Sequence, residues 1–155
     1  MAVDTGATTE FIDSTGVIWE QDQVYTPNGW GYIDDLGANN SRADQNILGT
    51  ADDPLYQTYR EGLKGYRFDL PAGEYEIDLR FVEPLNLGSG RRVFSVSVNG
   101  KVVITDLDLA GEVKSFSPVV KIFEAFSTAK EGLTITFAPV KGKPVLSGIK
   151  IRKIS

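Results

Sequence analysis

Apolar and polar side chains alternate with a period of two along the middle of the chain. Tyrosine, isoleucine, leucine and phenylalanine take every second position of residues 75–81, and Glu76, Asp78 and Arg80 stand between them. Successive side chains of a β-strand point to opposite faces of a sheet, so this pattern predicts a strand with one face in the core and one in water. Residues 75–81 are therefore expected to form a half-buried strand.

The alternation continues towards the C-terminus. From Arg92 to Val98 large apolar residues alternate with serines, and Asn99-Gly100-Lys101 then supplies a positive-φ turn into residues 102–104, which predicts a β-hairpin. Further strands are expected in four other places, on the same grounds of alternation and flanking turn residues: 11–20 around an Asp-Ser-Thr-Gly turn, 119–123, 133–137 with Thr134 and Thr136 outward, and 145–151.

Short strands separated by glycine and proline turns at intervals of about ten residues are typical of an antiparallel β-sandwich or jelly roll. The chain is therefore expected to be all-β. Its best helical candidate, Phe123–Lys130, has only a weak helical pattern. Residues 22–53 are rich in Asn, Asp and Gly and are expected to form a long irregular loop, which is either a binding loop or a plain surface excursion.

Composition limits the class of partner. The chain has 155 residues, 41% of them hydrophobic, which is enough for one compact core. Its net charge of −5 argues against nucleic acid, because such binding needs clustered Lys and Arg, and it favours a neutral ligand. No apolar run approaches the roughly 20 residues of a membrane span, so no membrane partner is expected. The chain also starts without a signal peptide, and Met1-Ala2 directly before a globular sequence indicates a domain excised from a larger protein.

The chain has neither cysteine nor histidine, which removes thiolate nucleophiles, Ser-His-Asp triads, and zinc sites built on thiols or imidazoles. Two-carboxylate glycosidase chemistry stays open through Glu76, Asp78 and Glu83, but their spacing along one strand does not establish a facing pair. No cofactor is expected. Asp106-Leu107-Asp108 with Gly111 and Glu112 offers oxygens to a structural calcium ion, although it lacks the spacing of a known calcium motif.

The order of several short motifs carries a family resemblance, which runs from Thr8 to nearly the end of the chain. These motifs are Leu55-Tyr56-Gln57-Thr58, Gly73-Glu74-Tyr75 in a strand that ends Phe81-Val82-Glu83, Arg92-Val93-Phe94-Ser95-Val96 with Val98-Asn99-Gly100-Lys101, Leu133-Thr134-Ile135-Thr136-Phe137 and Leu146-Ser147-Gly148-Ile149-Lys150-Ile151. In this order and spacing, they resemble the malectin domain family. The sequence is most similar to malectin-like domains at the C-terminal end of bacterial β-galactosidase-like glycoside hydrolases, and more distantly to the animal endoplasmic-reticulum lectin that binds diglucose.

The resemblance implies that residues 1–155 are a single malectin-like domain that binds an oligosaccharide or polysaccharide and targets an attached glycoside hydrolase. It implies no catalysis by the domain itself. Galactose-containing polymers are the first class to consider, and a periplasmic or extracellular location follows from the association with such hydrolases. The alternative is a structural sandwich that packs against the hydrolase and binds no sugar, in which case an apolar surface patch should be exposed.

The family's sugar-binding residues carry over poorly. The animal lectin has a Tyr-Phe pair where this chain has Pro84-Leu85-Asn86, a tyrosine at the position of Glu61, and an acidic residue near Gly142 and Lys143. Its first loop aromatic corresponds to Trp30-Gly31-Tyr32. The resemblance therefore supports the fold and a carbohydrate ligand, but it does not support diglucose specificity.

Candidate sugar contacts follow from aromatic rings and polar groups in loops. Trp30, between two glycines, is the first stacking candidate, and the alternative is that it packs beneath the long loop. Trp19 is expected in the core. Tyr56 is expected to point inward, whereas Tyr59 or Arg60 should reach the surface.

The loop of residues 84–91 is expected at the family's binding end, although it can equally be a flexible loop tip. If Arg91 and Lys143 converge there, the ligand could be an acidic sugar such as a uronate. The complete set of predicted carbohydrate contacts is Trp30, Tyr32, Tyr59, Arg60, Glu61, Asn86, Arg91 and Lys143.

Overall fold

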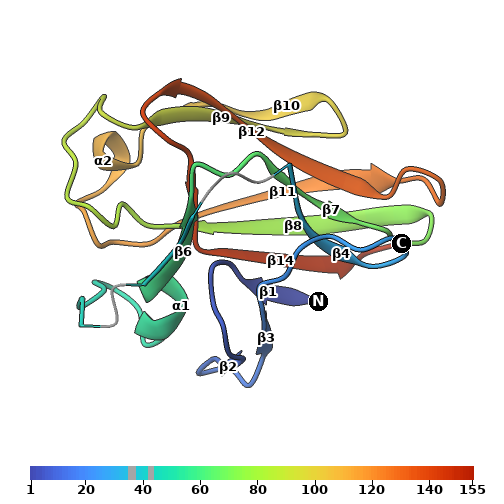
Figure 1. Ribbon diagram of the computed structural model, residues 1–155, viewed down its shortest axis with the longest axis horizontal. Helices are drawn as coiled ribbons and strands as arrows, with labels where there is room; N and C mark the ends of the chain where they lie inside the picture. The colour runs from blue at the N-terminus through green and yellow to red at the C-terminus, as the bar shows by residue number, and fades with distance from the viewer. Residues whose placement is uncertain (35–37, 42–43) are drawn as a thin grey trace.

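Two antiparallel sheets packed face to face make up most of the molecule (Figure 1). The computed structural model describes residues 1–34 and 44–155 in full and the backbone of residues 38–41. The larger sheet has the order β11-β8-β14-β1-β3-β2. Its strands are β1 (Ala2–Asp4), β2 (Phe11–Ile12), β3 (Ile18–Gln21), β8 (Gly73–Phe81), β11 (Val119–Ser127) and β14 (Gly148–Lys153).

The second sheet has the order β10-β9-β12-β7-β4, and a small third sheet has the order β13-β6-β5. The second sheet contains β4 (Trp30–Ile33), β7 (Gly65–Phe68), β9 (Val93–Val98), β10 (Lys101–Leu107) and β12 (Leu133–Lys141). The third contains β5 (Ala38–Ser41), β6 (Thr58–Glu61) and β13 (Val145–Leu146). Among the named strands that the structure describes, only β1 and β3 pair in parallel. The all-β antiparallel sandwich expected from the sequence is confirmed.

Strand β8 has the predicted alternation. Tyr75, Ile77, Leu79 and Phe81 are buried in the core, between the two sheets. Asp78 differs from the expectation because it is nearly buried, and the guanidinium of Arg80 donates to both of its carboxylate oxygens, at 3.0 and 2.9 Å. The outward face of this strand thus carries an ion pair within the strand in addition to solvated charges.

The β9–β10 hairpin is also confirmed. Asn99 and Gly100 connect the two strands and both have positive φ, 48° and 80°, as a two-residue type I′ turn requires. The Asn99 side chain in addition accepts from the backbone N–H of Thr134 at 2.8 Å and donates to the carbonyl of Gly132 at 3.1 Å. This asparagine therefore fixes the turn to the start of β12.

A smaller apolar cluster lies outside the main core, next to β3 and the short helix α1 (Asp53–Gln57). Trp19 is fully buried there, as expected, together with Leu55, Tyr56 and Val82. The inward orientation of Tyr56 is confirmed. Tyr56 also belongs to the Leu-Tyr-Gln-Thr motif, so this motif anchors α1 to the outer face of the larger sheet.

Two sequence expectations about the elements are wrong. Phe123–Lys130 is not helical, because most of it belongs to β11, which pairs with β8 along its whole length and has the two-residue alternation of an edge strand. Besides α1, the described part of the chain has one other helix, α2 (Leu109–Glu112). No helix in that part is long and apolar enough to cross a membrane. The region 22–53 is not one irregular loop, since it contains β4 and β5, while 35–37 and 42–43 lie outside the described residues.

The two ends of the sandwich differ in character (Figure 1). The end that we call the loop end carries the loop of residues 84–91, both helices and the turn of residues 141–144. The opposite end, the hairpin end, carries the turns at 99–100 and 128–132 and the C-terminus. The loop end and the hairpin end thus lie at opposite ends of the same core.

Candidate functional site

A buried arginine forms the floor of the loop end. Arg92, at the start of β9, donates from Nε to Glu83 at 2.7 Å, from Nη2 to Glu61 at 2.9 Å and from Nη1 to the carbonyl of Lys143 at 2.5 Å. The side chains of Arg92 and Glu83 are 2% and 1% exposed. One guanidinium therefore joins the ends of β6 and β8 and the turn before β13.

Burial by itself lowers the pKa of Arg92, but the hydrogen bonds and charges of Glu83 and Glu61 outweigh it and hold the pKa above its usual range. The arginine is therefore a permanent cation with its donors directed at fixed acceptors. Glu61, which the sequence suggested as a sugar contact, uses one carboxylate oxygen for Arg92 and is still partly exposed at 19%. Only the other carboxylate oxygen of Glu61 is therefore left for a contact at the surface.

Three polar residues lie exposed around this floor. Asn86 has a φ of 56°, and the exposed side chains of Arg91 and Lys143 make no hydrogen bond or ion pair within the described part of the chain. Gly142 brings the last two together, because a Cβ on it would lie 2.7 Å from the carbonyl oxygen of Arg91. The backbone segments that carry Arg91 and Lys143 are thus neighbours.

The loop of residues 84–91 is tied down by Asp108, the N-cap of α2. One carboxylate oxygen of Asp108 accepts from the Ser89 hydroxyl at 2.7 Å and from the Gly90 N–H at 2.8 Å, and the other accepts from Gly111. The Ser89 hydrogen bond is the largest of the influences that lower the pKa of Asp108, so this carboxylate stays ionised. These bonds anchor the tip of the loop one residue before Arg91.

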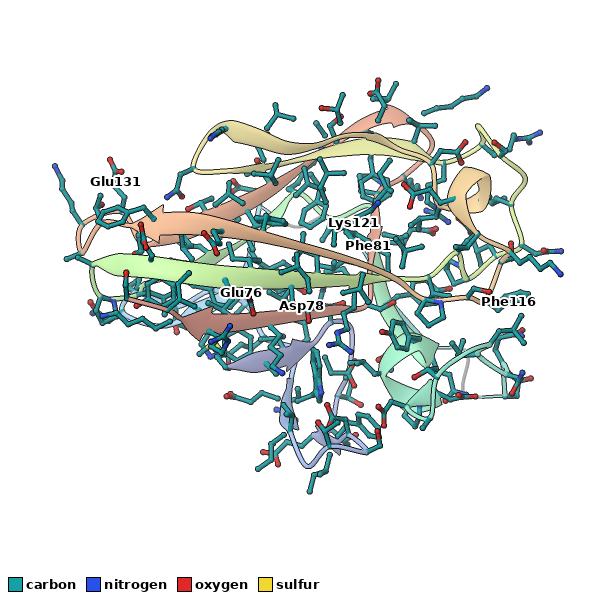
Figure 2. All side chains as sticks on the ribbon, turned by 180° about the vertical axis from the view of Figure 1, so that it is seen from behind. Glu76, Asp78, Phe81, Phe116, Lys121 and Glu131 are labelled. Atoms are coloured by element: carbon teal, nitrogen blue, oxygen red, sulfur yellow. The ribbon has the colours of Figure 1, made fainter. Side chains whose placement is uncertain are left out.

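Phe116 is a residue that the sequence reasoning missed. It lies at the loop end, as Figure 2 shows, and is partly exposed. Its φ of 63° is unusual for a bulky residue, and two backbone hydrogen bonds hold it there, from its N–H to Glu83 at 3.2 Å and from Leu48 to its carbonyl at 2.8 Å. The available signal was an aromatic residue between serines just before a proline, outside any alternating segment.

The aromatic candidates from the long region lie elsewhere. Trp30 belongs to β4, is 8% exposed and stacks on Phe68 with 6.1 Å between ring centroids. The expectation of a loop ring without strand partners is therefore wrong, and the alternative of a packed ring holds. Tyr32, two residues further along the same strand, is partly exposed and meets the ring of Tyr66 edge-on.

Tyr59 and Arg60 are also buried, at 4% and 3% exposure, so the expectation that one of them reaches the surface is wrong. The guanidinium of Arg60 lies 3.8 Å from the centroid of the Tyr32 ring, and its Nε donates to Asp22 at 2.9 Å. Asp22 also accepts from the hydroxyl of Tyr66 at 2.8 Å. The eight predicted contacts thus divide into a loop-end group (Glu61, Asn86, Arg91, Lys143) and an inner group (Trp30, Tyr32, Tyr59, Arg60).

The three carboxylates considered for catalysis are each engaged by an arginine. Glu76 pairs with Arg152, Asp78 with Arg80 and Glu83 with Arg92. Figure 2 shows Glu76 and Asp78 side by side along one strand rather than across a cleft. A glycosidase needs two carboxyl groups facing one another across the scissile bond, and these three do not provide that arrangement.

The calcium candidates are likewise engaged. Asp108 caps α2 as described above, and Glu112 pairs with Lys121 at 2.9 Å. Throughout the described residues there is no group of three or more acidic side chains that could hold a metal ion.

The architecture defines a class of protein, the antiparallel β-sandwich. The sequence matches the model of the malectin domain over residues 1–149, so the chain belongs to the malectin domain family. The malectin domain is a carbohydrate-binding fold.

Known proteins that share the domain are much longer than this chain. A solved structure, Bacteroides uniformis β-glucuronidase, superimposes with a TM-score of 0.91 and 36% identity, covering 100% of this chain and 18% of that one. Malectin-B of Xenopus laevis is 40% identical over 65 residues, which are 40% of this chain and 24% of that protein. Kinesin-like protein KIN-14R of Arabidopsis thaliana is 32% identical over 122 residues, 76% of this chain and 11% of that protein. This chain therefore spans less than a quarter of each relative.

Proposed function

We propose that this chain is a non-catalytic carbohydrate-binding module whose loop end binds an oligosaccharide or polysaccharide and brings an attached glycoside hydrolase to its substrate. Membership in the malectin family supports a carbohydrate ligand. Similarity over the whole chain to a small part of a β-glucuronidase supports attachment to a hydrolase. Because such enzymes act on glycans outside the cytoplasm, the proposal includes an extracellular or periplasmic location.

The observation that carries the proposal is the exposed pair of cations, Arg91 and Lys143, on neighbouring backbone segments over a rigid floor. The chain as a whole is acidic, with a net charge of −5, whereas the side chains of these two cations have no acidic partner in the described part of the chain. A guanidinium binds a carboxylate in a two-pronged geometry, and Lys143 adds a point charge beside it. We therefore propose a uronate-containing glycan as the preferred ligand, with galactose-containing glycans as the neutral class to compare.

The remaining loop-end groups suit the rest of a sugar ring. The amide of Asn86 can donate to one hydroxyl and accept from the next. The partly exposed ring of Phe116 can stack on the apolar face of a pyranose, a contact worth about 1 kcal/mol. In this proposal the charged groups select the acidic sugar, while the ring and the amide bind features common to all pyranoses.

Isothermal titration with a tetragalacturonate and with a β-1,4-linked galactotetraose tests the proposal. Replacing Arg91 and Lys143 by alanine should weaken binding of the uronate at least about tenfold, because charged hydrogen bonds are lost. Lys153→Ala is the matched control, because it removes an exposed cation away from the loop end. Unchanged uronate affinity in the double variant would remove the acidic-sugar ligand from the proposal.

The scaffold alternative is supported by one observation. Strand β11 exposes Val120, Ile122 and Phe126 on the outward face of an edge strand, which is the kind of apolar strip that a neighbouring domain covers. Occurrence of the domain in a kinesin-like protein, whose name denotes no carbohydrate function, is consistent with this alternative. If the chain bound no glycan of an array that includes plant and algal polysaccharides, the scaffold would be favoured over the binding module.

A further inference from the structure

A groove opens at the hairpin end, far from the loop-end group. It has a volume of about 320 Å³ and lies between β10 and β11, the edge strands of the two larger sheets. Val98, Val103 and Ala125 contribute apolar lining, and Lys101, Glu124 and Phe126 complete it. This volume is at the lower limit of typical small-molecule sites.

Phe126 is unusually exposed for a residue beside such a groove. The side chain is 59% exposed, and a second hollow of about 130 Å³, lined with Glu74 and Glu124, lies against it. The ring is thus bordered by two hollows and is accessible to solvent. An exposed ring beside concave surface is the arrangement in which an aromatic residue stacks on a sugar or another flat apolar face.

Two polar side chains of the groove are available to a ligand. The side chains of Glu124 and Lys101 make no hydrogen bond or ion pair to the residues that the structure describes in full. Their opposite charges balance one another across the groove, which favours a neutral ligand rich in hydroxyl groups over an ion. Asn99 closes the groove, and its side-chain bonds to Gly132 and Thr134 make that wall rigid.

We propose that this groove is a second saccharide site, which binds a neutral pyranose unit with its apolar face on Phe126 and its hydroxyls on Glu124 and Lys101. The inference depends on the proposed function only for the class of ligand. Strands β8 and β11 are nine residues long, so the two sites are separated by roughly 30 Å along the sandwich at the usual strand rise. A polysaccharide that reaches both would bind with increased avidity.

The test uses the ¹⁵N-labelled chain, titrated with a β-1,4-linked glucotetraose and a β-1,4-linked galactotetraose. Saturable shifts of the amide signals of Lys101, Ala125 and Phe126 with at least one of them are expected. Phe126→Ala should weaken binding at these signals about tenfold through the lost stacking. Ile122→Ala is the matched control, because Ile122 is equally exposed, at 60%, on the same face of β11 but outside both hollows. Circular dichroism confirms that both variants fold.

The outcomes separate this inference from the proposed function. Shifts confined to the loop end and insensitive to Phe126→Ala would overturn the second site and leave the proposed function standing. Shifts at the groove that survive loss of Arg91 and Lys143 would support the second site even if the loop end binds nothing. Equal losses in Phe126→Ala and Ile122→Ala would indicate general apolar adhesion along β11 and would overturn the second site. The absence of shifts anywhere, with these probes and with the tetragalacturonate, would overturn both.

Discussion

At the scale of single residues, Arg92 shows how one buried charge organises a surface. It contacts Glu83, Glu61 and the backbone of Lys143, so it fixes the relative positions of segments that are distant in sequence. A buried ion pair is weak support for stability in itself, since desolvation offsets much of the attraction. Its importance here is positional, because it holds Glu61 and the backbone of Lys143 at the loop end.

Removing Arg92 should therefore be costly. Arg92→Met leaves Glu83 buried without its counter-ion, and we expect a loss of about 3–5 kcal/mol in the free energy of unfolding. Urea denaturation measures it. The double variant with Glu83→Gln should recover part of the loss, because the uncompensated charge is gone. A single variant as stable as the parent would contradict the structural role of this arginine.

A second residue-scale prediction concerns Asp4, which is buried beneath the inner group. Burial, more than the repulsion of Asp22, raises its pKa from 3.8 to about 7, although a hydrogen bond from Thr58 acts in the opposite direction. Because the folded protein holds this proton where the unfolded chain does not, stability should fall as the pH rises from about 4 to about 7, by up to about 4 kcal/mol. Above about pH 7, the ionisation of Asp4 should cause no further change in stability.

Chemical denaturation at a series of pH values checks this expectation. Asp4→Asn should flatten the slope, since the amide does not titrate, while Glu10→Gln, at an exposed position, should retain it. A slope that is the same in all three proteins would assign the pH dependence to other groups.

At the scale of elements, a glycine in β14 allows the smaller apolar cluster to pack on the larger sheet. A Cβ on Gly148 would lie 3.0 Å from the Trp19 ring and 3.4 Å from Leu55. The Trp19 ring also lies 5.1 Å from the guanidinium of Arg80 on the neighbouring strand β8. The glycine of the Leu-Ser-Gly-Ile motif thus has a steric reason, because Trp19 and Leu55 pack directly over it.

Gly148→Val should separate Trp19 from the sheet and lower stability by about 1–3 kcal/mol, as overpacking does in other cores. Thermal unfolding and the tryptophan fluorescence spectrum would report the change. Gly88→Ala is the control, because no atom lies within 4 Å of the added Cβ and its φ is outside the positive region. A Gly148→Val variant with unchanged stability and fluorescence would disprove the close packing.

At the scale of the whole molecule, the distribution of charge predicts how binding responds to salt. The chain carries a net charge of −5, whereas the loop end presents unpaired cations. Exposed charges are screened within about 10 Å at 0.1 M salt and about 3 Å at 1 M. Binding of a uronate at the loop end should therefore weaken as salt increases, and binding of a neutral sugar at the hairpin end should not.

Titrations of the tetragalacturonate and of a neutral tetrasaccharide at low and high sodium chloride separate the two cases. Parallel salt dependence for both ligands would contradict the assignment of charged recognition to one end and neutral recognition to the other. The comparison needs no variant and therefore does not depend on how any substitution folds.

The sequence by itself determined strands β8, β9, β12 and β14 and the hairpin at Asn99-Gly100, because a two-residue alternation and turn chemistry are local properties of the chain. It also singled out the loop of residues 84–91 and Lys143, whose role as sugar contacts stays a prediction. It failed for Trp30, Tyr59 and Arg60, since the burial of an aromatic or charged side chain depends on which distant strand lies against it. Only the tertiary structure decided that Arg92 forms the floor of the loop end, that the backbone of Phe116 is bonded to Glu83 and that Phe126 borders a groove, because each depends on contacts between segments far apart along the chain.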